Sequence, residues 1–124
     1  MRGVLLSLMI LTSACDGTVT AKGVVVDTRG RPIEGARLTV RGETMQADRS
    51  GCFKIFEITS PYSHTIPLIV DAPGFHSIDG EFPAPGDVRL RITLSAEAQA
   101  PDGAVVWYPL RGALGQCEPS WAWK

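Results

Sequence analysis

The sequence contains no run of lysine and arginine and carries almost no net charge. Its 12 basic and 13 acidic side chains give a formal net charge of −1 over 124 residues. Proteins that bind nucleic acid gather basic residues on one surface, whereas here basic and acidic residues are interspersed. We therefore expect no nucleic-acid partner.

The motifs that usually mark catalytic and metal sites are also missing. The chain has no HExxH, HxH, CxxC or GxSxG pattern, and its two histidines are His64 and His76. Ser63 precedes His64, but neighbouring strand residues point to opposite faces, so this adjacency does not form a triad. A metal site could recruit both histidines together with Asp71 or Asp79, but two histidines exposed in loops are the simpler interpretation. We expect no catalytic residue, no metal and no cofactor.

No apolar run reaches the length that crosses a bilayer as a helix, and the one notable run lies at the N-terminus. After Met1 and Arg2, residues 4–11 are apolar except for Ser7. This length is typical of the hydrophobic part of an export signal. Small residues follow at 12–14, directly before Cys15, and this order resembles a bacterial lipoprotein signal.

The resemblance to a lipoprotein signal implies where the protein works. Residues 1–14 would be a cleaved signal peptide, and 15–17 a short tether lipidated at Cys15. Acyl chains on Cys15 would attach the protein to a membrane. The expected location is the envelope of a Gram-negative bacterium, on the inner or the outer membrane and facing the periplasm.

Cysteine is scarce, and its count suggests a crosslink. If Cys15 carries lipid, Cys52 and Cys117 remain as an even pair. In an oxidising compartment the simplest interpretation is a disulfide between them. It would close a loop of about 65 residues, for which chain entropy gives roughly 4 kcal/mol of stabilisation. Two unpaired buried thiols are the alternative. A reactive thiol or a pair of metal ligands is disfavoured, because neither cysteine has a His or Cys at ligand spacing.

The rest of the chain is typical of an all-β domain. Thirteen glycines and nine prolines separate short runs in which apolar and polar residues alternate,. Strands are expected at 18–27, 36–41, 44–47, 52–58, 66–72 and 88–94, with another near 77–82 and a strand-like stretch at 104–110. About seven closely spaced strands predict an antiparallel β-sandwich over 18–95. Residues 96–124 would be an extension that packs on it.

Turn and core residues between positions 23 and 94 follow a familiar order. They are Gly23, Val25, Asp27, Gly30, Pro32, Ile33, Gly35, Ala36, Leu38, Val40, Asp48, Gly51, Phe53, Leu68, Val70, Ala72, Pro73, Gly74, Phe75 and Leu94. Together they resemble the carboxypeptidase regulatory-like domain, a transthyretin-like β-sandwich. The resemblance implies a scaffold or recognition module without catalytic residues of its own, so we expect a protein that is not an enzyme.

Aromatic residues are few, and four of them lie in the C-terminal extension: Trp107, Tyr108, Trp121 and Trp123. They form a candidate binding surface for a sugar ring or a partner protein. For Trp107 and Tyr108 the alternative is an added strand that covers the sandwich and is held by Cys117. Trp121 and Trp123 lie at the end of the chain, where order is often lost.

Arginines alternate on two of the expected strands: Arg37, Arg41, Arg89 and Arg91. If those strands pair, one sheet face would bear several guanidinium groups, either balanced by nearby acids or open to an anionic ligand. The expected function is a lipid-anchored envelope module with a structural or protein-interaction role. A carbohydrate-binding module using the tail aromatics is the alternative, and a small hydrolase built around His64 or His76 is a remote one.

Overall fold

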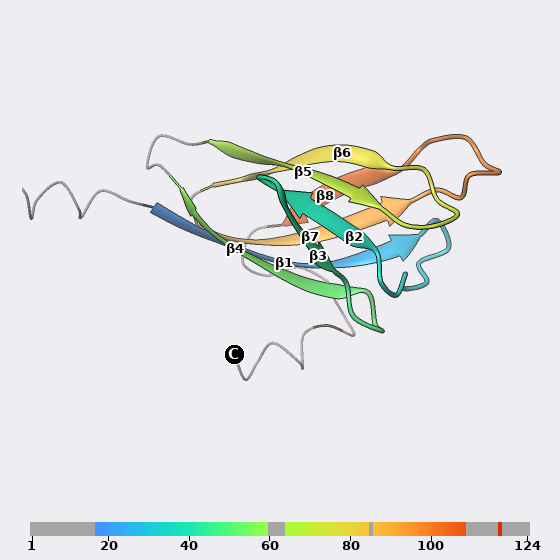
Figure 1. Ribbon diagram of the computed structural model, residues 1–124, viewed down its shortest axis with the longest axis horizontal. Coiled ribbons are helices and arrows are strands. Elements are labelled where there is room, and N and C mark those ends of the chain that lie inside the picture. The colour runs from blue at the N-terminus through green and yellow to red at the C-terminus, as the bar shows by residue number, and fades with distance from the viewer. Residues whose placement is uncertain (1–16, 60–63, 85, 109–116, 118–124) are drawn as a thin grey trace, which may run out of the picture.

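The computed structural model describes residues 17–59, 64–84, 86–108 and 117. This part of the chain contains eight strands and no α-helix. The strands are β1 (Gly17–Asp27), β2 (Arg37–Val40), β3 (Glu43–Gln46), β4 (Cys52–Thr59), β5 (Thr65–Asp71), β6 (Ile78–Pro83), β7 (Gly86–Leu94) and β8 (Ala104–Tyr108) (Figure 1). The strand predicted near 77–82 is present as β6, and β8 forms residues 104–108 of the strand-like stretch predicted at 104–110, whose last two residues lie outside the described ranges.

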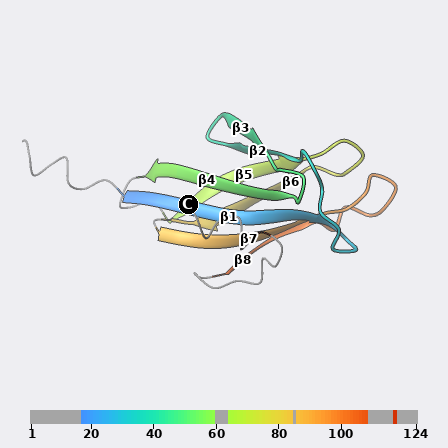
Figure 2. The same cartoon turned by 90° about the horizontal axis from the view of Figure 1, so that it is seen from below.

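The strands form two sheets that pack face to face. Sheet A has the order β4-β1-β7-β8, and sheet B has the order β3-β2-β5-β6. Figure 2 shows the strands of sheet A side by side in one layer, with those of sheet B behind them. The predicted all-β sandwich is therefore confirmed, and the strand expected at 44–47 corresponds to β3, which lies at an edge of sheet B.

One pairing differs from the expected antiparallel arrangement. β1 and β7 run parallel, in a register from Val19 opposite Gly86 to Asp27 opposite Leu94. The other pairings between the described strands are antiparallel. A parallel pair needs a long crossover connection. Here the connection includes all four strands of sheet B, and it returns the chain to sheet A in its original direction.

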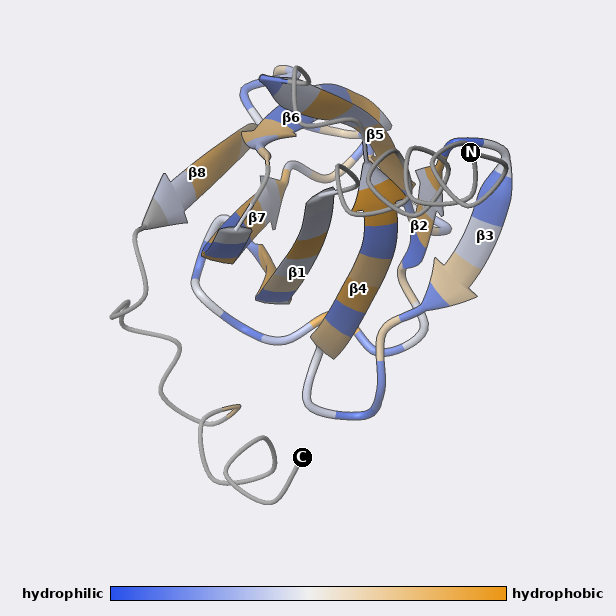
Figure 3. Ribbon diagram, turned by 90° about the vertical axis from the view of Figure 1, so that its left-hand side faces the viewer, coloured by the Kyte–Doolittle hydropathy of each residue, from blue (hydrophilic) through white to orange (hydrophobic). Residues whose placement is uncertain are grey.

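The core lies between the sheets and follows the alternation of each strand. Every second residue from Val88 to Leu94 of β7 is buried, and β5 shows the same period of two. The banding of apolar and polar residues is visible along β4 and β7 in Figure 3. Burial of a large apolar side chain contributes about 1.5–3 kcal/mol. The largest fully buried side chains are Phe82, Leu38, Ile55, Ile66, Leu68, Leu90, Ile92 and Leu94.

Gly23 makes room for the aromatic ring at the centre of this core. Gly23 lies opposite Phe53 in the β1–β4 register. A Cβ atom at Gly23 would overlap the Phe53 ring and would lie 2.7 Å from the Leu90 carbonyl oxygen. A side chain at position 23 would therefore push Phe53 out of the core, which explains why glycine occurs in the middle of a strand.

Candidate functional site

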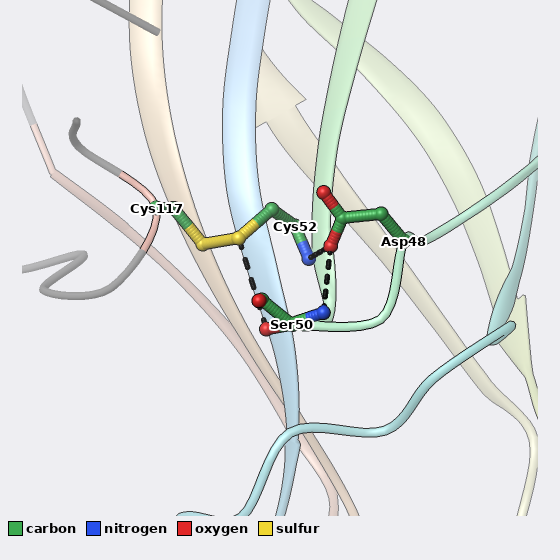
Figure 4. The surroundings of a disulfide bond; sticks show 4 residues. All are labelled: Asp48, Ser50, Cys52 and Cys117. Carbon is green, nitrogen blue, oxygen red and sulfur yellow. Dashed lines mark hydrogen bonds between the residues drawn. A yellow bond between two sulfur atoms is a disulfide. The ribbon is translucent and has the colours of Figure 1, made fainter. Parts of the chain in front are cut away.

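The predicted cysteine pair is joined in the structure. A disulfide links Cys52 at the start of β4 to Cys117, with the two Cα atoms 5.7 Å apart (Figure 4). With Val24 and Val26 of β1 the two cysteines form a small buried cluster, separate from the main core. Val24 and Val26 alternate with inward-facing residues of β1, so this cluster lies on the outer face of sheet A. The crosslink thus fixes Cys117 to that face.

The turn before β4 fixes the position of Cys52. The Asp48 carboxylate accepts hydrogen bonds of 2.9 Å from the amides of Ser50 and Cys52 (Figure 4). The Asp48 carbonyl accepts one of 3.0 Å from the Gly51 amide. Gly51 has a φ of 76°, a conformation that glycine adopts readily,. The Ser50 carbonyl lies 3.7 Å from the Cys52 sulfur, which has no proton to donate within a disulfide.

Two large apolar side chains are exposed at one end of sheet A. Phe56 is 57% exposed and Ile58 is 63% exposed, and both lie on the outer face of β4. They lie opposite Thr20 and Thr18 of β1, beside the point where β1 begins at Gly17. We call this the anchor end, because Cys15, the predicted lipidation site, precedes Gly17 by two residues; Cys15 itself is outside the described residues.

A row of basic residues crosses the same outer face. Lys54 lies opposite Lys22, and Lys22 lies opposite Arg89 on the other side. This row could not be predicted from the sequence, because its members come from three strands and meet only through the register of the sheet. The exposed apolar pair left a signal in the sequence, since Phe56 and Ile58 interrupt the apolar-in, polar-out alternation of β4.

A cation also lies beside Ile58. The β2–β3 hairpin turns at Arg41 and Gly42, whose φ angles are 51° and 82°. Two residues with positive φ are typical of the two-residue type I′ hairpin. The Arg41 guanidinium donates a 2.8 Å hydrogen bond to the Ile58 carbonyl at the open edge of β4. It thereby links the edges of the two sheets.

The opposite end of the sandwich contains a hollow of about 260 Å³. It is lined by Asp27, Thr28, Arg29, Arg31, Phe75, Ala96 and Gln99. The Asp27 carboxylate accepts hydrogen bonds from the amides of Arg29 and Arg31, at 2.8 and 2.9 Å, and from the Arg31 guanidinium at 3.0 Å. Burial raises the pKa of Asp27, but these hydrogen bonds and the Arg31 charge outweigh burial and bring the pKa below its ordinary value,. Asp27 holds the turn together and remains ionised.

The two histidines lie at opposite ends of the sandwich. His64 directly precedes β5 at the anchor end and is exposed. His76 lies beyond the other end of β5, with its Nε2 atom 2.8 Å from the Gln99 carbonyl oxygen. They do not share a site. Asp71 forms an ion pair with Arg37 at 3.0 Å. Within the described ranges, no three His, Cys, Asp or Glu residues are grouped as metal ligands.

The tail aromatics are only partly described. Trp107 lies on β8 opposite Leu90 and is 52% exposed. Tyr108 is the last residue of β8, while Trp121 and Trp123 lie outside the described residues. β8 extends sheet A as an added edge strand, which was the alternative for Trp107 and Tyr108. A Cβ atom at Gly80 would overlap the side chain of Val105, so β8 also packs against β6 of sheet B.

The four arginines that would share one sheet face if their strands paired do not come together. Arg37 belongs to β2 in sheet B, whereas Arg89 and Arg91 belong to β7 in sheet A. Arg41 lies in the hairpin turn rather than on the strand. The basic row that does form combines Arg89 with lysines of β1 and β4.

Comparison with known proteins identifies the fold. No protein-family model and no curated protein matches the chain. Among solved structures, catechol 1,2-dioxygenase from Acinetobacter radioresistens has a TM-score of 0.56 at 15% identity, covering 70% of this chain and 54% of that one. Hydroxyquinol 1,2-dioxygenase from Pseudomonas putida DLL-E4 has a TM-score of 0.51 at 16% identity, covering 65% and 57%. 3-Chlorocatechol 1,2-dioxygenase from Rhodococcus opacus 1CP has a TM-score of 0.50 at 15% identity, covering 64% and 59%.

These neighbours correct one prediction. We expected a protein that is not an enzyme because the resembled domain lacks catalytic residues, but enzymes contain the same β-sandwich fold. The fold therefore does not exclude catalysis, and that prediction was wrong. This chain spans less than two thirds of each dioxygenase chain. At such low identity the likeness shows the fold alone, and no dioxygenase reaction follows from it.

Proposed function

We propose that this protein is a lipid-anchored β-sandwich of the bacterial cell envelope, of the carboxypeptidase regulatory-like kind. Acyl chains on Cys15 hold it to a membrane, and the sandwich meets a partner in the periplasm. The observation that carries the proposal is the apolar run at 4–11, followed by small residues and Cys15 only two positions before β1. That spacing leaves almost no linker between anchor and domain.

The disulfide is a further observation that supports an exported protein. Structural disulfides persist in oxidising compartments such as the periplasm, and Cys52 and Cys117 are bonded,. Across the described ranges, no helix has the length and apolar character needed to span a bilayer. A lipid on Cys15 supplies the membrane attachment that the proposal requires.

Metabolic labelling tests the anchor. Cells expressing the full chain are fed an alkyne analogue of palmitate, and the recovered protein is examined for the label. The wild-type chain should be labelled and Cys15→Ala should lose the label. Cys52→Ala is the matched control, since it removes a cysteine elsewhere and should keep the label. A labelled Cys15→Ala chain would overturn the proposal.

The partner-binding part of the proposal is supported by the edge strand β8. Val106 and Trp107 are adjacent on this strand and about half exposed. Exposed aromatic residues are enriched at protein interfaces. A photo-crosslinking amino acid at position 107 should give a discrete protein adduct in cells, whereas position 69, on the other sheet, should give none. Absence of an adduct at 107, with binding of a glycan that requires Trp107, would favour the carbohydrate-binding alternative.

A further inference from the structure

The anchor end of sheet A carries apolar side chains that the fold does not need. Phe56 and Ile58 are two residues apart on β4, so they point to the same face,. Of the large apolar side chains exposed in the described residues, they are the two most exposed. Their neighbours Phe53 and Ile55 fill the core from the other face. The outward pair therefore needs an explanation other than packing between the sheets.

Covalent geometry places the lipid beside this pair. Extended chain advances at most about 3.6 Å per residue, so the Cα atom of Cys15 lies within about 7 Å of that of Gly17. Gly17 lies opposite Thr59, and the next residue, Thr18, lies opposite Ile58. Paired strands are about 4.8 Å apart. Any acyl chain on Cys15 must therefore start close in space to Ile58, only a few residue lengths away.

Basic side chains lie on the same outer face, farther from the anchor end than Phe56 and Ile58. The Lys54–Lys22 pair lies one outward-facing position beyond Phe56, and Arg89 extends the row across β7. Lysine and arginine side chains near a membrane surface are attracted to anionic lipid headgroups. Asp87, opposite Thr20, is the acidic exception. Apolar groups next to the anchor and cations beyond them match the order of acyl chains and phosphate headgroups at a bilayer surface.

We propose that the outer face of β4 at the anchor end lies against the lipid bilayer, with Phe56 and Ile58 inserted at the boundary between headgroups and acyl chains. The inference rests on the proposed lipidation of Cys15. The sandwich then lies on the membrane along the β4 edge of sheet A. β8, at the opposite edge of that sheet, is the strand of sheet A farthest from β4 and stays open to a partner.

Photolabelling from within the bilayer tests the contact. The full chain, extracted with detergent from the membranes of cells that express it, is reconstituted into vesicles of phosphatidylethanolamine and phosphatidylglycerol with a trace of phospholipid bearing a diazirine on its acyl chain. After illumination, labelled peptides are located by mass spectrometry, and the intact mass of each sample records acylation. We compare the wild-type chain, the double variant Phe56→Ser/Ile58→Ser, and Ile69→Ser. Ile69 is a matched control because it is 44% exposed on β5 in the other sheet.

The expected result is label on β4 (Cys52–Thr59) above that on β5 (Thr65–Asp71) in the wild-type chain. The double variant should lose the β4 label while keeping its acyl chains and its unfolding temperature, and Ile69→Ser should keep the β4 label. An acylated wild-type chain with no more label on β4 than on β5 would overturn this inference and leave the anchor standing. A wild-type chain without acyl chains would overturn both.

Discussion

The two faces of β4 carry the same kinds of side chain, buried on one face and exposed on the other. Phe53 and Ile55 point inward and are buried, whereas Phe56 and Ile58 point outward and are more than half exposed. Residue type alone therefore does not decide what a side chain does in this strand. The inward pair stabilises the fold, and the outward pair is available for contact with another surface.

The largest effect should come from the inward face. Phe53→Ala removes a buried ring from the centre of the core and should lower the free energy of unfolding by about 3–5 kcal/mol. Denaturant unfolding of the oxidised protein measures the loss. A loss below about 1 kcal/mol would mean that the inward face of β4 contributes no more than its outward face.

The next effect should come from the crosslink on the outer face. Cys52→Ser should lower the free energy of unfolding by about 2–4 kcal/mol under oxidising conditions. The disulfide joins residues separated by 65 positions, and without it the unfolded chain is less constrained,. Under reductant the same substitution should cost much less. Urea unfolding with and without reductant separates the two. Equal losses in both conditions would contradict a stabilising role for the bond.

A smaller effect should come from the polar end of β1. The pKa of Asp27 is lower in the folded chain than in the unfolded one, so its stabilisation is present above the ordinary pKa near 4 and is lost as pH falls through the folded value,. Asp27→Asn should lower stability at neutral pH by about 1 kcal/mol and flatten the acid dependence. Thermal unfolding from pH 7 to pH 2 measures this. An unchanged acid profile in the variant would contradict it.

The smallest effect on stability should come from the outward face. Phe56→Ala should change the free energy of unfolding by no more than about 0.5 kcal/mol, as is usual for exposed positions. The comparison with Phe53→Ala in the same denaturant titration sharpens the distinction between the two faces. A loss as large as that of Phe53→Ala would show that Phe56 is packed into the fold.

Much of this architecture could be predicted from the chain, because alternation with a period of two is a local property. The inward residues of β4, β5 and β7 could be read directly, and the cysteine pair followed from an even count after Cys15. The parallel pairing of β1 and β7 could not be read, since alternation does not encode strand direction. The strands predicted at 36–41 and 44–47 leave the turn between them at 42 and 43, but the chain turns at Arg41 and Gly42. The difference arises because Arg41 adopts a positive φ, which is uncommon for residues other than glycine.

The surface features were harder to predict than the core. The Lys54–Lys22–Arg89 row depends on the register of three strands that are distant in sequence. The prediction that the protein is not an enzyme failed for a different reason. It transferred a property of one domain family to a fold that enzymes also contain,.

The central claim is that acyl chains on Cys15 tether a disulfide-bonded sandwich to a membrane. The most direct measurement is the intact mass of the protein extracted from membranes with detergent, taken before and after reduction. The account predicts the mass of residues 15–124 plus acyl chains, with a gain of two hydrogen atoms on reduction. The mass of the uncleaved chain, or of a cleaved chain without acyl groups, would contradict it.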